Sequence, residues 1–159
     1  MIGQMKILLH VKTLKQEQAF RHLQSCRRAL YEAEHAHHAA VKAVEESQRT
    51  LPARENAIFE TIFGRTVALG EIDEIKARVA TLHAKHQILV DERERTAHVE
   101  ARVRRERDEA ADAFRKATKV TDKYDVITQD LVTAQAEALT AREEGETEDM
   151  FSRSRRKIA

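Results

Sequence analysis

The chain of 159 residues is poor in the residues on which compact folds depend. It has no tryptophan, one proline, one cysteine and four glycines, and aromatic residues make up only 4%. A thick core needs bulky side chains and a β-rich fold needs turn residues, so this composition argues against an ordinary globule. The single cysteine, Cys26, excludes a disulfide within the chain and fits a reducing compartment.

Long apolar runs and an excess of one charge are also missing. No apolar run approaches the roughly 20 residues that cross a bilayer, and the opening segment lacks the length and cleavage site of a signal peptide. We therefore expect a cytosolic protein. The chain has 28 basic and 27 acidic residues. Because nucleic-acid binding requires a surplus of basic residues on one face, this balance argues against nucleic acid as the main partner.

Catalytic motifs are missing as well. The sequence has no P-loop, no dinucleotide-binding glycine pattern and no nucleophile elbow. Its many carboxylates are expected on exposed helix faces, where nothing desolvates them. We therefore expect a protein that is not an enzyme and needs no cofactor.

What the chain does have is a seven-residue apolar repeat in two runs. The first run is Leu9, Gln16, Leu23, Leu30, His37, Val44 and Leu51. The second is Ile75, Leu82, Leu89, Thr96, Val103, Ala110, Ala117, Tyr124, Leu131 and Ala138. Such spacing keeps one stripe facing a partner helix in a left-handed supercoil. The fold class predicted is all-α, a long antiparallel two-helix coiled-coil hairpin.

The hairpin is predicted to span residues 1–144. Helix one is expected at about 5–63, the turn at 64–70 and helix two at about 71–144, followed by a flexible charged tail at 145–159. Gly64 and Gly70 can adopt positive φ in the turn, and Pro52 predicts a kink or short break in helix one. If the chain folds about residue 67, positions whose numbers add to about 134 lie opposite each other.

A second stripe is expected beside each seven-residue run. In helix one its members are small: Ala19, Cys26, Ala33, Ala40 and Ser47. In helix two it changes side, from Ile72, Val79 and His86 to Val99, Ala113, Val120, Ile127, Ala134 and Ala141. The change falls in a charged stretch at 91–95, which predicts a local irregularity of the supercoil.

Histidines suggest a metal site as one alternative. His35, His37 and His38 cluster near the position opposite His98, and His83 and His86 are one turn apart. Either set could bind a metal if the rings converged. No acidic or cysteine ligand accompanies them, and a polar residue in a seam more often fixes the register. We therefore predict no metal.

Two apolar clusters have two interpretations each. Ile58, Phe59, Ile62 and Phe63 either close the end of the hairpin or form a docking surface, since a two-helix tip cannot easily bury so many large side chains. The N-terminal stretch MKILLHVKTLKQEQAFRHL is either a membrane-surface segment or, as we favour, the open end of the hairpin in contact with a partner.

Several stretches resemble a known family. They are the opening LLHVKTLKQEQA, the Ala-rich first helix, the G-x-I-D-E-I-K start of the second helix, and K-x-x-D-K-Y ahead of an acidic tail that ends near Met150 and Phe151. On these the chain resembles the YscO-type proteins of bacterial type III secretion, which are relatives of the flagellar export protein FliJ.

The resemblance implies a stalk that sits at the hexameric secretion ATPase, peripheral to the inner membrane, contacts the export gate and handles translocator chaperones. The gate-contacting face of the family implies a docking role for Ile75, Val79, Leu82 and His86, to which we add the tip residues Phe59 and Phe63. For the ATPase we predict a charged contact at the open end, through Lys12, Lys15, Arg27 and Arg28. A generic coiled-coil scaffold, the flagellar counterpart, and a metal- or nucleic-acid-binding rod stay open, as does the oligomeric state.

Overall fold

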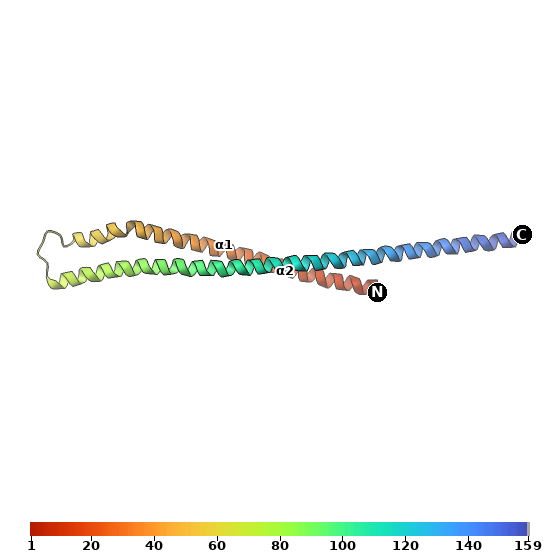
Figure 1. Cartoon of the computed structure of the whole chain (residues 1–159), viewed down its shortest axis with the longest axis horizontal. Helices are drawn as coiled ribbons and strands as arrows, with labels where there is room; N and C mark the ends of the chain where they lie inside the picture. Colours follow the sequence, from red (N-terminus) through yellow and green to blue (C-terminus); the bar gives the residue numbers. More distant parts are fainter. Residues whose placement is uncertain (159) are drawn as a thin grey trace. The chain divides into compact units, whose positions relative to one another are not determined.

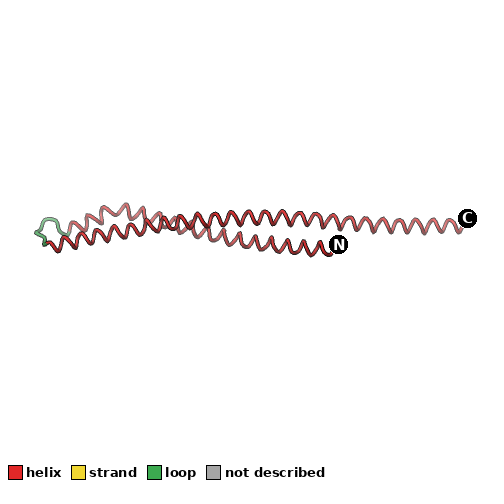
Figure 2. Tube along the Cα trace, turned by 60° about the horizontal axis from the view of Figure 1, so that its bottom comes forward, coloured by secondary structure: helices red, strands yellow, loops and turns green. Residues whose placement is uncertain are grey.

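Residues 1–158 are described by a computed structural model. Helix α1 spans Ile2–Glu60 and helix α2 spans Leu69–Ile158, and this part of the chain contains no strand. The two helices are joined by one loop and run antiparallel (Figures 1 and 2). The predicted all-α helical hairpin is thereby confirmed.

Each helix contributes to two compact units. The terminal unit comprises Met1–Leu23 and Ala110–Ala159, and the turn unit comprises Gln24–Glu109. In the turn unit, Leu30, Ala33 and Val103 form a buried cluster against which Val99 packs. Both stripes predicted for this part of α1 are buried or half-buried. Among the described residues no large side chain is fully enclosed, because two helices can cover only one stripe of each other.

Polar pairs across the seam define the register. In the turn unit His37 Nδ1 lies 3.1 Å from Thr96 Oγ1, and Ser47 Oγ lies 2.8 Å from His86 Nδ1. In the terminal unit Gln16 Nε2 donates to Thr118 Oγ1 at 3.2 Å. The residue numbers of each pair add to about 134, as the predicted turn position requires. A slipped register would separate these groups, so the polar seam selects this one.

The terminal unit buries different residues from those predicted. Thr121 and Thr128 are buried, whereas Ala113, Val120 and Ile127 are exposed, so the predicted second stripe of α2 is wrong there. The buried threonines lie four residues after the core positions Ala117 and Tyr124. Each hydroxyl donates to a carbonyl of its own helix, at 2.9 Å for Thr121 and 2.7 Å for Thr128. Their polar groups are thus satisfied at the seam.

The loop lies slightly earlier than predicted. Helix α1 ends at Glu60 rather than Phe63, and Gly70 belongs to the first turn of α2 rather than to the turn. Gly64 does adopt a positive φ of 75°. The early start of α2 has a local cause, because the Glu71 carboxylate accepts the Ala68 N–H at 3.0 Å, one half of a capping box.

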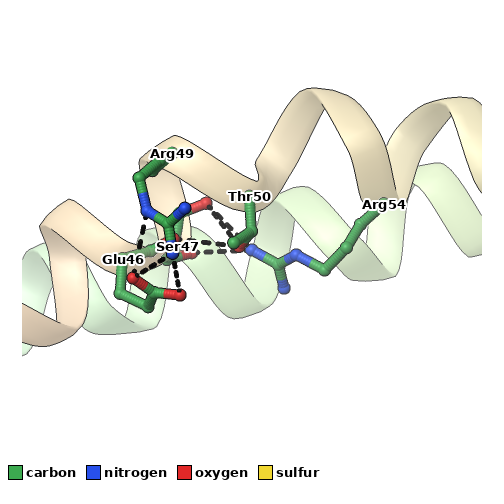
Figure 3. A network of polar contacts seen from close by, with 5 residues as sticks. All are labelled: Glu46, Ser47, Arg49, Thr50 and Arg54. Carbon is green, nitrogen blue, oxygen red and sulfur yellow. Dashed lines mark hydrogen bonds and ion pairs between the residues drawn. The ribbon is translucent and has the colours of Figure 1, made fainter.

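Pro52 lies inside α1, which continues through it. The ribbon of α1 changes direction in its orange part, ahead of the loop (Figure 1). Pro52 has no N–H with which to hydrogen-bond the carbonyl four residues before it. The loss of this bond, with the steric clash of the ring, kinks a helix. Side chains donate hydrogen bonds to the carbonyl groups just before this point. Thr50 Oγ1 donates to Glu46 O at 2.9 Å, and Arg54 Nη2 donates to Ser47 O at 3.0 Å (Figure 3).

The segment predicted as a tail is helical as far as Ile158, so the predicted end of helix two near Glu144 is wrong. One glycine, Gly145, costs a helix only about 1 kcal/mol relative to alanine. The last turn carries Arg155, Arg156 and Lys157, which the helix dipole favours at a C-terminus. Ala159 lies outside the described residues.

Candidate functional site: two docking faces

The first face belongs to the terminal unit. Lys12 and Lys15 of α1 line one shallow hollow with Lys116, Ala117 and Val120 of α2. The Lys12 ammonium lies 5.4 Å from the centre of the Tyr124 ring, a cation–π contact that holds this lysine over the seam. The hollow therefore has apolar walls and a cationic rim.

The terminal unit also carries many exposed apolar side chains. On α1 they are Ile7, Leu8, Val11 and Leu14, and on α2 they are Val120, Val126, Ile127 and Val132. Isolated exposed apolar residues are common, but a concentration of this kind in one unit is typical of an interaction surface.

Arg27 and Arg28, the other two cations predicted for this site, belong to the turn unit. Both are exposed. Within residues 1–158 none of the four predicted cations forms an ion pair with a carboxylate. The structure brings Lys12 and Lys15 together with Lys116, which the sequence analysis did not include.

The second face is at the loop end of the turn unit. Phe63 lies in the loop and is 74% exposed, and Phe59, Leu69 and Ile72 are also exposed. The interpretation that these residues only close the end of the hairpin is therefore incomplete, because the closure leaves large apolar surfaces in water.

The structure does not place Ile75 where it could contact the export gate, the role predicted for it. Its side chain is only 6% exposed, since it occupies the helix–helix seam, and it cannot contact a partner while the hairpin is closed. Val79 and Leu82 are half-buried. His86 is half-buried and its Nδ1 contacts Ser47, whose Oγ also accepts from Arg54 Nη2 at 3.0 Å.

A groove on the turn unit was missed by the sequence analysis. Its lining consists of Arg54, Ile58, Ala77, Arg78, Thr81, Leu82 and Lys85. The floor is apolar and three cations surround it. A signal was present, since Arg78, Leu82 and Lys85 are spaced by four and three and share one helix face, but the contribution of α1 required the hairpin register.

The unpaired cations of these faces contrast with the charged residues elsewhere. Arg49 donates three hydrogen bonds to Glu46, and Arg95 donates two to Glu92. These contacts hold the pKa of the Glu46 and Glu92 carboxyls below their ordinary value. Between the helices of the turn unit, Arg104 bonds Glu34 at 3.0 Å. The cations of the groove and of the lysine hollow have no such carboxylate in the described part of the chain.

The histidines do not converge on one point. His83 Nε2 lies 3.3 Å from Glu55 Oε1, while His86 contacts Ser47. His37 Nδ1 contacts the Thr96 hydroxyl, which also lies within hydrogen-bond distance of two carbonyls of its own helix. Within residues 1–158 no three His, Cys, Asp or Glu side chains are placed to hold a metal ion. Nor is any helix there long and apolar enough to cross a membrane.

Comparison with known proteins gives consistent matches. A family model described as "Type III secretion protein YscO" matches residues 5–153. The 2.8 Å crystal structure of the type III secretion protein YscO from Vibrio parahaemolyticus has a TM-score of 0.83, at 18% sequence identity over 93% of each chain. At that identity the structural similarity shows the fold. A search of curated proteins finds no match.

Proposed function

Because the chain belongs to the YscO family of type III secretion proteins, we propose that it is the coiled-coil stalk of a secretion apparatus. In this proposal it binds the hexameric secretion ATPase through Lys12, Lys15, Arg27 and Arg28, and the export gate through the loop end. It also handles translocator chaperones, and it works in the bacterial cytoplasm, peripheral to the inner membrane. The observation that carries the proposal is that one hairpin has two exposed surfaces of different chemistry. One has cations without a carboxylate partner, and the other has apolar side chains in water.

The lysine hollow supports the ATPase contact. Lys12 and Lys15 have no carboxylate partner in the described residues, so they are available for an acidic surface on another protein. Contacts between exposed charges form quickly and are screened by salt. A stalk inside a ring can in this way keep its position without being locked in one register.

The loop end supports the gate contact. Phe59 and Phe63 are exposed aromatic side chains, and aromatic residues are the commonest anchors of protein interfaces. Leu82, one of the predicted gate residues, also lines the cationic groove. Ile75 supports the face from below by packing in the seam.

The ATPase contact is tested with paired charge reversals. Lys12→Glu with Lys15→Glu, and separately Arg27→Glu with Arg28→Glu, are each expected to weaken binding to the purified ATPase at least tenfold at low salt. Lys42→Glu with Arg105→Glu is the matched control, because it changes net charge equally at two other exposed cations. Circular dichroism checks that helicity is unchanged. Equal binding by the three variants would contradict the proposal.

The gate contact is tested with Phe59→Ala and Phe63→Ala together. We expect this variant to retain ATPase binding and to lose both binding to the cytoplasmic part of the gate and secretion. Tyr31→Ala is the control, since Tyr31 is an aromatic residue elsewhere in the turn unit that is about as exposed as Phe63. If the Phe variant loses the ATPase instead, the two ends have the opposite assignment. Wild-type secretion by the double Phe variant and by both charge-reversal variants would favour a generic scaffold.

A further inference from the structure

Within residues 1–158, the last part of α2 packs against no other helix. Beyond Leu131 every described side chain of α2 is exposed. Met150 and Phe151, at 73% and 71% exposure, are large apolar residues in this segment. Large apolar side chains exposed side by side on a helix are typical of a surface that contacts another molecule.

Charge in this segment is divided into two blocks. An acidic block precedes Met150 and consists of Glu143, Glu144, Glu146, Glu148 and Asp149. A basic block follows Phe151 and consists of Arg153, Arg155, Arg156 and Lys157. No carboxylate or cation of either block takes part in an ion pair within residues 1–158. Both blocks are therefore free to pair with a second molecule.

The face between the blocks has the geometry of a helix-packing site. Thr147, Met150, Phe151 and Ser154 line one shallow hollow. Their spacing of three, four and seven is that of the four residues that form a hole for a knob of a facing helix. Thr147 and Ser154 are small, so a second backbone can approach closely on either side of the two apolar residues.

We propose that two copies of this chain associate through residues 143–158 of α2, antiparallel and with the two-fold axis beside Met150 and Phe151. In that arrangement the acidic block of each copy lies along the basic block of the other, twice over, as a self-complementary interface requires. A parallel arrangement would place like charges side by side. This inference goes beyond the proposed function and does not depend on it.

The composition of the interface predicts the strength of the association. Met150, Phe151 and Ile158 are the large apolar residues of the segment, so the apolar area buried is small and most contacts are between charges. Interfaces of this kind are weak and lose affinity with salt. The dimer is expected at low ionic strength and high protein concentration.

The test is sedimentation equilibrium of the full chain with charge-block variants. Reversal of the acidic block by Glu144→Lys, Glu146→Lys and Glu148→Lys is expected to weaken dimerisation at least tenfold. Reversal of the basic block by Arg153→Glu, Arg155→Glu and Lys157→Glu is expected to do the same. The two variants mixed in equal amounts should associate with each other, and a chain with both blocks reversed should recover the wild-type dimer.

Controls separate this interface from net-charge effects. Glu45→Lys, Glu60→Lys and Glu74→Lys together change the net charge equally at exposed positions of the turn unit, and this variant should still dimerise. Phe151→Ala should weaken the dimer without change in the charge blocks. A wild-type chain that stays monomeric at low salt would overturn the proposal. So would block variants that dimerise as well as wild type, or a mixture of them that does not associate.

Discussion

The turn unit and the terminal unit contain segments of the same two helices but differ in what they bury. In the turn unit the seam consists mainly of apolar and small residues, with Leu30, Ala33, Val44 and Val103 among them. In the terminal unit two of the buried residues are threonines, Thr121 and Thr128, while valine, leucine and isoleucine side chains remain in water. The seam of the turn unit is therefore the more apolar of the two, although the loop end of that unit also leaves apolar side chains exposed.

This difference teaches that a heptad pattern does not by itself say where stability and where binding are located. Burial of apolar area contributes roughly 25 cal/mol per Å², so a unit that leaves such area exposed gives up stability that a partner can recover. The Phe20–Phe114 contact, with ring centres 5.4 Å apart, is one of the larger apolar contacts that the terminal unit retains. Substitutions can measure this contrast.

The largest loss in the free energy of unfolding is expected from Leu30→Ala. Leu30 is 6% exposed in the core of the turn unit, and truncation of a buried leucine costs about 2–5 kcal/mol. Leu14→Ala in the terminal unit is the matched control, because Leu14 is 45% exposed and surface changes usually stay within about 0.5 kcal/mol. Urea denaturation gives both values. Equal losses would mean that the two units are packed alike. Leu89 is only half-buried, so Leu89→Ala should fall between them.

A smaller loss in the free energy of unfolding is expected from Ser47→Ala. The Ser47 hydroxyl is buried and contacts both His86 Nδ1 and Arg54 Nη2. Loss of one partner leaves a shielded polar group unsatisfied, which costs about 1–3 kcal/mol. Thr128→Ser, which keeps a hydroxyl at the seam of the terminal unit, is the comparison. If Ser47→Ala leaves the unfolding free energy unchanged, the polar seam has no part in the stability of the turn unit.

Thr121→Val with Thr128→Val should change stability little. Each hydroxyl already donates to a carbonyl of its own helix, although Thr121 Oγ1 also lies 3.2 Å from Lys12 O. Replacement of a buried polar group by an apolar one of the same shape is nearly neutral or stabilising, so we expect a change within about 1 kcal/mol. Val120→Thr with Ile127→Thr, the outward counterpart, should leave thermal stability unchanged. A large loss in the first variant would show that the threonines define the register.

The smallest effect is expected at the exposed pair Glu46–Arg49. Arg49 holds the pKa of Glu46 below its ordinary value of 4.5. The contribution of the pair is therefore fully present above that ordinary pKa and is lost as the pH falls through the lowered one. Glu46→Gln should lower the thermal midpoint at neutral pH by less than Ser47→Ala does, and the difference from wild type should vanish in strong acid. A difference that grows in acid would contradict this sign.

Sequence reasoning succeeded where one pattern had one solution. The seven-residue spacing identified Leu30, Val44, Ile75 and Val103 as seam residues. A fold point at residue 67, between Gly64 and Gly70, predicted the register of the helices. It failed where two neighbouring positions could both face the partner helix. Val120 and Thr121 are such a pair, and hydrophobicity favoured the one that the structure leaves outside.

By itself, then, the sequence determined the hairpin, its polar seam and the buried stripe of the turn unit, because the spacing of seven and a single break allow one way to pair the helices. Only the tertiary structure decided two further points: which face of α2 packs in the terminal unit, and that Arg54 joins Arg78 and Lys85 in one groove. The reason is physical. Each of these depends on contacts between residues far apart in the chain, which the spacing along one helix does not fix.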